Sequence, residues 1–259
     1  MEANKERLQD LLEVIREKAS LLGLKINSDK TKSMATSDSP LGLKCGDNTV
    51  EQVVDFRYLG STVERTGSSE KEVQSRIGQA SGAFNRLKPV WRSKKYSLKL
   101  KMRLFNSNVI SALLYSCECW KLNKHQEKRI LAFENNCLRR ILNINWRDHI
   151  TNQTVRSISR QPLVTDVIRQ RRWRYLGHVI RMAGDRLPRT VLEWQPEGTR
   201  RRGKPKNTIR RTYQRDLKHI NAIVQPQWED VWAAAHMRDD WRLFLDALGA
   251  SGGTGGTKV

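Results

Sequence analysis

Apolar residues recur every three to four positions from residue 72 to residue 142, a spacing that restricts this stretch to amphipathic helices. Three helices are predicted, and Ser69, Ser97 and Asn123 precede them as residues that typically cap a helix N-terminus. Pro89 limits the first helix. The apolar positions of the three helices are Val73, Ile77, Ala80, Phe84 and Leu87, then Leu104, Phe105, Val109, Leu113 and Leu114, then Ile130, Phe133, Cys137 and Ile141. The sequence therefore predicts a helical bundle.

The residues before this bundle predict a small α+β unit. Six apolar residues between Leu8 and Leu22 share one helix face, and Gly23 follows as a C-terminal stop. Residues 24–27 are expected to form a short strand. Val54, Phe56 and Tyr58 alternate with charged residues, which is typical of a half-buried strand.

The region after Trp146 is expected to be helical and basic. Helices are predicted over residues 163–183 and 207–220, and a last one contains Trp241. Residues 186–206 are rich in Pro, Gly and Arg and predict an extended basic loop. The predicted fold is mainly α, with a small α+β unit at 1–68, a helical bundle at 69–147, a basic region at 148–248 and a disordered tail at 249–259.

Positive charge gathers in one part of the chain. The net charge of the 259 residues is +21, yet residues 1–70 hold 10 Lys and Arg against 12 Asp and Glu. Residues 156–215 hold 17 Lys and Arg against 4 Asp and Glu. A field of that strength favours a polyanionic partner, RNA or DNA, over a merely solvated surface.

The remaining composition indicates an intracellular protein. Four cysteines are too few for the disulfide framework of a secreted protein of this length. The charged N-terminus does not resemble a signal peptide, and no apolar run is long enough to span a bilayer. The stretch at residues 199–206 resembles a nuclear-localisation signal, so the nucleus is the expected compartment.

Residues for metal-dependent chemistry are not apparent in the sequence. Phosphoryl transfer by two metal ions needs paired carboxylates, but Asp239-Asp240 lies in a helical pattern. The spacing of Cys117, Cys119, His125 and Cys137 does not match a zinc site. We therefore expect no catalytic residue, metal or cofactor in this chain.

Tryptophan is followed by arginine four times, and two basic stretches are candidate phosphate-binding sites. Arg171, Arg172 and Arg174 surround Trp173 in a predicted helix. The alternative is that the indole rings are core and the arginine stems cover them, and for Trp173 we expect a core position. The second stretch is interrupted by Gly and Pro and holds Arg200, Arg201, Arg202, Lys204 and Lys206.

The order of several short motifs resembles the C-terminal part of a non-LTR, LINE-type retrotransposon reverse transcriptase. The segment Gly23–Asn27 with Lys30-Thr31-Lys32 is similar to the family's fourth palm motif, and Phe56–Ser61 is similar to its primer grip. Leu113-Leu114-Tyr115 with Trp120, and residues 138–142, resemble its thumb. The resemblance implies that residues 1–68 are a palm remnant and that residues 69–147 are a thumb-like bundle. Residues 173–182, 201–206 and 235–242 resemble the basic region beyond the thumb.

The resemblance implies roles for particular residues. Lys30 would lie near the nucleotide site, and Tyr58, Leu59 and Gly60 would position a primer end. The catalytic carboxylates of the palm would precede Met1, so the chain would be inactive alone. It would need Mg²⁺ only if a separate palm and fingers completed the polymerase. Three hypotheses follow: a truncated polymerase of a mobile element, a stand-alone binding module expressed alone or adopted by its host, or a polymerase whose activity a separate palm restores.

Overall fold

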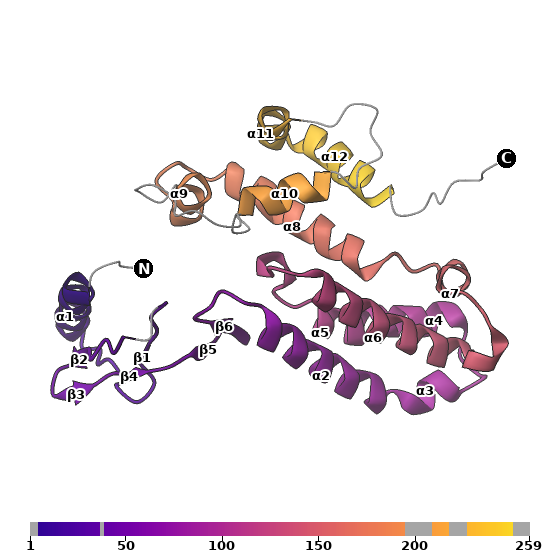
Figure 1. The fold of residues 1–259 in the computed structure, drawn as a ribbon, viewed down its shortest axis with the longest axis horizontal. Helices are drawn as coiled ribbons and strands as arrows, with labels where there is room; N and C mark the ends of the chain where they lie inside the picture. Colours follow the sequence, from indigo (N-terminus) through magenta and orange to yellow (C-terminus); the bar gives the residue numbers. More distant parts are fainter. Residues whose placement is uncertain (1–4, 37–38, 195–208, 218–226, 251–259) are drawn as a thin grey trace. The chain divides into compact units, whose positions relative to one another are not determined.

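The computed structural model describes residues 5–36, 39–194, 209–217 and 227–250 (Figure 1). The chain divides into two units, residues 1–75 and 76–259. Helices dominate and the strands are short, which confirms the predicted fold class. The boundary between these units falls inside helix α2 (Glu70–Arg86). The predicted domain boundaries after residues 68 and 147 stay predictions.

The first unit builds a small core between one helix and two strand pairs. Helix α1 (Lys5–Leu21) ends before Gly23, whose φ of +73° confirms the predicted stop. Gln9 of α1 bonds both the N–H and the carbonyl of Lys44 at 2.8 Å, so the helix is fastened to strand β2. The strand pairs are β1 (Lys32–Ser33) parallel to β4 (Glu51–Gln52), and β2 (Lys44–Cys45) antiparallel to β3 (Asn48–Thr49).

The strand predicted at residues 24–27 is absent. Ile26 packs against the small core of Leu43, Cys45 and Val50. The Asn27 side chain accepts a hydrogen bond from the backbone N–H of Lys30 at 3.0 Å and closes a turn instead. The local hydrogen bonding of Asn therefore outweighs the apolar pattern at this point.

A hairpin of β5 (Asp55–Tyr58) and β6 (Ser61–Glu64) follows. Its two turn residues, Leu59 and Gly60, have φ of +48° and +82°, as a two-residue hairpin turn requires. The predicted strand is confirmed, but its half-burial is wrong, because Val54 and Tyr58 are exposed. A two-stranded hairpin has too few neighbours to bury a whole face.

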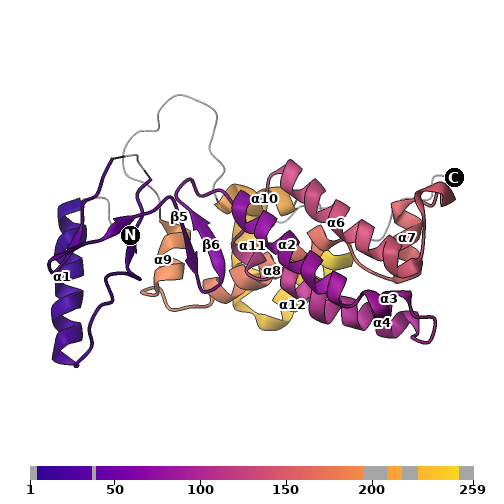
Figure 2. The same ribbon diagram turned by 90° about the horizontal axis from the view of Figure 1, so that it is seen from below.

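The predicted helical bundle is present. Ser97 accepts a hydrogen bond from the N–H of Leu100, and Asn123 accepts one from the N–H of Gln126, so two of the three predicted caps are confirmed. The elements are α2 (Glu70–Arg86), α3 (Lys88–Arg92), α4 (Leu98–Leu104), a π-helical turn η1 (Phe105–Ile110), α5 (Ser111–Leu113), a 3-10 turn η2 (Cys117–Cys119) and α6 (Lys124–Leu142). Figure 2 shows α3 and α4 at the same end of the bundle, where Lys101 of α4 donates to the Trp91 carbonyl of α3 at 2.8 Å. Helix α3 also contacts α6.

Helix α8 (Val164–Ile180) organises the rest of the second unit, and α11 and α12 pack against it (Figure 1). Its Trp173, Leu176 and Ile180 form an apolar core with residues of α10, α11 and α12. The other elements are a 3-10 turn η3 (Trp146–Asp148), α7 (Asn152–Ser159), α9 (Leu187–Glu193), α10 (Ile209–Leu217), α11 (Trp228–His236) and α12 (Arg238–Ala250). The helices predicted at 163–183, at 207–220 and around Trp241 are confirmed within the described residues.

The extended loop predicted at residues 186–206 is wrong in its first part, which forms α9. Pro188 occupies the first turn of this helix, where a missing N–H costs nothing. Residues 195–208, which contain Arg200, Arg201, Arg202, Lys204 and Lys206, lie outside the described residues, as does the tail from residue 251.

Gly177 lies where α8 meets the Trp241 indole, and Gly177→Ala should lower the melting temperature. A Cβ at this position would lie 2.2 Å from the Trp241 Nε1 atom. Overpacking of this kind costs about 1–3 kcal/mol or more, which exceeds the roughly 1 kcal/mol that Ala gains over Gly in a helix. Circular-dichroism melts would measure the change.

Gly78→Ala is the matched control, because Gly78 is an exposed glycine of α2, and an added methyl group would have no atom within 4 Å apart from the adjoining backbone of its own helix and its chain neighbours. This variant should melt slightly above the parent protein. If Gly177→Ala were stabilised equally, the close contact between Gly177 and Trp241 would be refuted.

Candidate nucleic-acid interface

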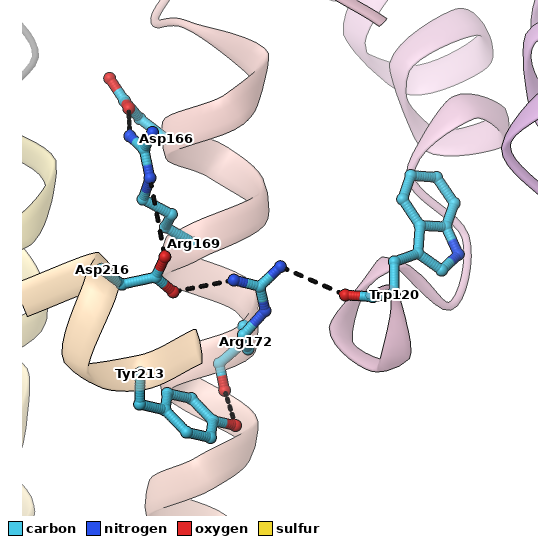
Figure 3. Close-up of polar contacts among 6 residues, drawn as sticks. All are labelled: Trp120, Asp166, Arg169, Arg172, Tyr213 and Asp216. Atoms are coloured by element: carbon cyan, nitrogen blue, oxygen red, sulfur yellow. Dashed lines mark hydrogen bonds and ion pairs between the residues drawn. The ribbon is translucent and has the colours of Figure 1, made fainter. Parts of the chain in front are cut away.

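Arg172, predicted to contact phosphate, points into the fold. Its Nη1 lies 2.8 Å from Oδ2 of Asp216 in α10, and its Nη2 donates to the Trp120 carbonyl at 3.4 Å (Figure 3). Only 6% of the side chain is exposed. A phosphate could reach this guanidinium only if the buried ion pair opened, so Arg172 is a structural residue in this fold.

Two other arginines of α8 near Arg172 also make contacts inside the fold. Arg169 pairs with Asp166, and its Nε lies 4.0 Å from Oδ1 of Asp216 (Figure 3). Arg171 donates to the Leu114 carbonyl at 3.1 Å and so ties α8 to the end of α5. Part of the predicted basic face of α8 therefore holds helices together.

Other arginines of the basic segment also make internal contacts. Arg156 lies 2.7 Å from Oε2 of Glu134, and Arg181 donates to the Ala235 carbonyl at 2.6 Å. Burial raises the pKa of Glu134, and Arg156 opposes that rise. The charge of residues 156–215 is thus partly explained by internal ion pairs and by carbonyls at helix ends.

The remaining predicted site residues are divided between the two units. Arg174 is exposed on α8 of the second unit. Lys30 lies in an exposed turn of the first unit, and Tyr58 and Leu59 are exposed at the tip of the β5–β6 hairpin. The roles implied for them stay predictions.

No three His, Cys, Asp or Glu side chains among the described residues are placed to hold a metal ion. Cys117 and Cys137 are buried, and burial raises the pKa of each thiol to about 12, so both are neutral at physiological pH. Asp239 and Asp240 lie exposed in the first turn of α12, as the helical pattern predicted.

None of the described helices is both long enough and apolar enough to cross a membrane.

A basic groove, not predicted from the sequence, lies where α3 meets the end of α6. Residues 88–103 hold seven Lys and Arg and no Asp or Glu. A cavity of about 430 Å³ is lined by Phe84, Asn85, Lys88, Trp91, Arg92, Arg139, Arg140, Asn143, Ile144 and Asn145. A second, of about 560 Å³, is lined by Asn136, Arg139, Arg140, Ile144, Asn145, Trp146 and Ile150. The two share four residues, and we call them together the α3–α6 groove.

Packing beneath the groove places its cations. The Trp91 indole is buried, stacks on Phe84 at 5.3 Å between ring centroids and donates to the Phe84 carbonyl at 2.8 Å. This anchors the short helix α3, and Lys88 and Arg92 remain exposed on it. Two basic side chains of the groove are therefore set on a fixed backbone.

The opposite wall is the C-terminal turn of α6. Asn143 ends this helix in the left-handed conformation, with φ of +56°. Arg139 donates to the Ile150 carbonyl at 2.7 Å and to Oδ1 of Asn152 at 2.9 Å, which fixes its guanidinium. Arg140 is exposed, and no ion pair to it occurs within the described residues. Cations near a helix C-terminus also complement its dipole.

Trp146 lies at the second cavity and is 77% exposed. The guanidinium carbon of Arg147 lies 5.3 Å from the centroid of its ring. Sequence reasoning missed this residue because most Trp-Arg pairs were expected in the core. A usable signal was that Trp146 comes after the apolar stripe of α6 ends at Ile141 and before α7 begins at Asn152, so it belongs to neither helix.

Comparisons with known proteins relate this chain to mobile elements. The sequence family described as a domain of unknown function (DUF6451) matches residues 83–115, which include α3. An uncharacterized transposon-derived protein of Caenorhabditis elegans is 29% identical over 197 residues, which cover 72% of this chain and 70% of that protein. No solved structure matches the chain. The similarity supports a transposon origin.

Proposed function

We propose that the second unit binds nucleic acid through the α3–α6 groove, in a protein derived from a LINE-type reverse transcriptase. The observation that carries the proposal is the lining of the first cavity. It combines Lys88, Arg92, Arg139 and Arg140 with three asparagines and contains no carboxylate. The transposon-derived relative supports a mobile-element origin, and the order of the motifs in the sequence supports a reverse transcriptase as its source.

The chemistry of this lining suits a sugar-phosphate backbone. Arginine presents a planar fork of donors that matches phosphate oxygens, and lysine adds a point charge. Asparagine amides donate to phosphates and accept from sugar hydroxyls. Because no carboxylate competes for the cations in this cavity, an anionic ligand would gain their full charge. The groove therefore fits a phosphate backbone better than a neutral ligand.

Removal of two cations from the groove should weaken binding of a DNA duplex. We expect Lys88→Ala with Arg140→Ala to raise Kd about tenfold and to lower the log–log salt slope by about 2, since each lost phosphate contact removes about 0.9 of slope. The two side chains are exposed, so the melting temperature should change little. Fluorescence anisotropy across about 50–200 mM salt would measure both quantities.

The matched control is Lys124→Ala with Lys128→Ala, which removes the same charge from exposed positions nearer the start of α6 and outside the groove lining. This pair should retain most of the affinity. Equal losses in the two double variants would mean that diffuse charge, and not the groove, binds DNA. A parent protein without salt-dependent binding would refute the function itself.

A further inference from the structure

We infer that Trp146 and Arg147 form a platform for an unpaired base, so that the α3–α6 groove takes single-stranded nucleic acid in preference to duplex. This inference rests on the proposed function and names the form of its ligand. It starts from the large exposed ring of Trp146 at the wall of a basic cavity.

The exposure of Trp146 sets it apart from the other Trp-Arg pairs. Trp91, Trp173 and Trp241 are all buried, as apolar rings of this size usually are. Trp146 instead leaves 77% of its surface in contact with solvent. Its indole contributes little to the core, and its surface is available to a ligand.

The ring is carried by a closed turn. The Asp148 carboxylate accepts a hydrogen bond from the backbone N–H of Asn145 at 2.7 Å. The N–H of His149 donates to the carbonyl of Trp146 at 3.4 Å, and φ of His149 is +50°. A fixed backbone presents the ring at low entropic cost, which favours binding by an exposed aromatic.

Arg147 adds to the platform by placing its guanidinium over the indole at 5.3 Å. Such a cation–π contact orients the ring and keeps a positive charge beside it. Arginine planes also stack on bases, so the pair can present two flat surfaces of compatible chemistry. This combination fits a nucleobase attached to an anionic backbone.

The position of Trp146 links the platform to the phosphate-binding cations. Trp146 lines the same cavity as Arg139 and Arg140. A base on the indole would therefore have its phosphates near these two guanidinium groups. The bases of a duplex are already stacked and paired, so their faces are not free for an indole. Only an unpaired strand can use both features of the groove.

Anisotropy titrations of the full chain and of Trp146→Ala would test this inference with four labelled probes of about 12 nucleotides, within the usual site size for single strands. The probes are oligo-thymidine, oligo-uridine, an abasic strand with the same phosphates and a duplex. Trp146→Ala should weaken binding to a base-bearing single strand by about fivefold to 150-fold, as expected for one lost stacked base. Binding to the abasic strand and to the duplex should change by less than about twofold.

Trp146→Phe is the matched variant, because it keeps an aromatic face, and it should retain most of the affinity. Oligo-thymidine and oligo-uridine distinguish DNA from RNA as the single strand that is bound. Equal losses of affinity for the two strands in Trp146→Ala indicate stacking alone, and a larger loss for oligo-uridine indicates RNA as the ligand. The melting temperature of both variants should equal that of the parent, since the ring is exposed.

Three results would overturn the inference: equal losses on all four probes, no loss on any probe, or early melting of Trp146→Ala. If Lys88→Ala with Arg140→Ala weakens binding while Trp146→Ala does not, the platform is refuted and the groove stands. If the parent chain binds no probe, the proposed function itself has failed.

Discussion

Replacement of Trp173 by Ala should lower the free energy of unfolding by about 3–5 kcal/mol, the usual cost of removing a large buried aromatic side chain. The ring is fully buried, with its centroid 5.0 Å from that of Tyr213 and 5.2 Å from that of Phe244. Truncation would leave a cavity among α8, α10 and α12. Urea denaturation followed by circular dichroism would measure the loss.

Two variants sharpen this test. Trp194→Ala removes an exposed indole and should change stability by less than about 0.5 kcal/mol. The stability loss of Trp173→Phe should lie between those of Trp194→Ala and Trp173→Ala. The Trp173 Nε1 has no hydrogen-bond partner within the described residues, so this change loses only ring size. A Trp173→Ala protein of normal stability that binds single strands weakly would show that this ring is a stacking platform instead.

Arg172→Ala should also cost about 3–5 kcal/mol, because it leaves the Asp216 carboxylate buried without its partner. The carboxylate side chain is only 4% exposed, and Arg169 offers it a contact at 4.0 Å, which is a poor substitute for the 2.8 Å ion pair. Urea denaturation at neutral pH would measure this loss. Joint replacement by Arg172→Met and Asp216→Leu should recover most of the stability, since no charge is then left unpaired.

Arg174→Ala is the control for Arg172, because Arg174 is the exposed arginine two positions further along α8. It should leave stability within about 0.5 kcal/mol of the parent. A weaker affinity for DNA in this variant would support the phosphate contact predicted for Arg174. Equal destabilisation by the two arginine variants would contradict the buried ion pair.

The helices could be predicted from the sequence because helix formation depends on neighbours along the chain. The caps Ser97 and Asn123 were identified by residue type and by the apolar pattern behind them, and the structure confirms both. Prediction failed at residues 24–27, where Asn27 makes a turn, and at α9, where Pro188 starts a helix. In both places a local hydrogen bond or backbone preference overrode the composition.

The α3–α6 groove could not be predicted, because its two walls are about fifty residues apart in the sequence. Lys88 and Arg140 read separately as ordinary exposed cations. Only the packing of α3 on α6 places them around one cavity. The concentration of charge in the sequence instead predicted a phosphate-binding region at residues 156–215. Several arginines of that region form internal ion pairs in the structure.

The four Trp-Arg pairs separate what the sequence decided from what the tertiary structure decided. The sequence determined that an aromatic and a basic residue are neighbours along the chain, and its apolar pattern determined the helices near them. Trp173 is a core residue, as expected from its helical pattern, but only the tertiary structure separates the buried Trp91 and Trp241 from the exposed Trp146. Burial depends on which helix faces meet, and that meeting is settled by contacts distant in sequence. The same dipeptide therefore stabilises the fold at three positions and is open to a ligand at the fourth.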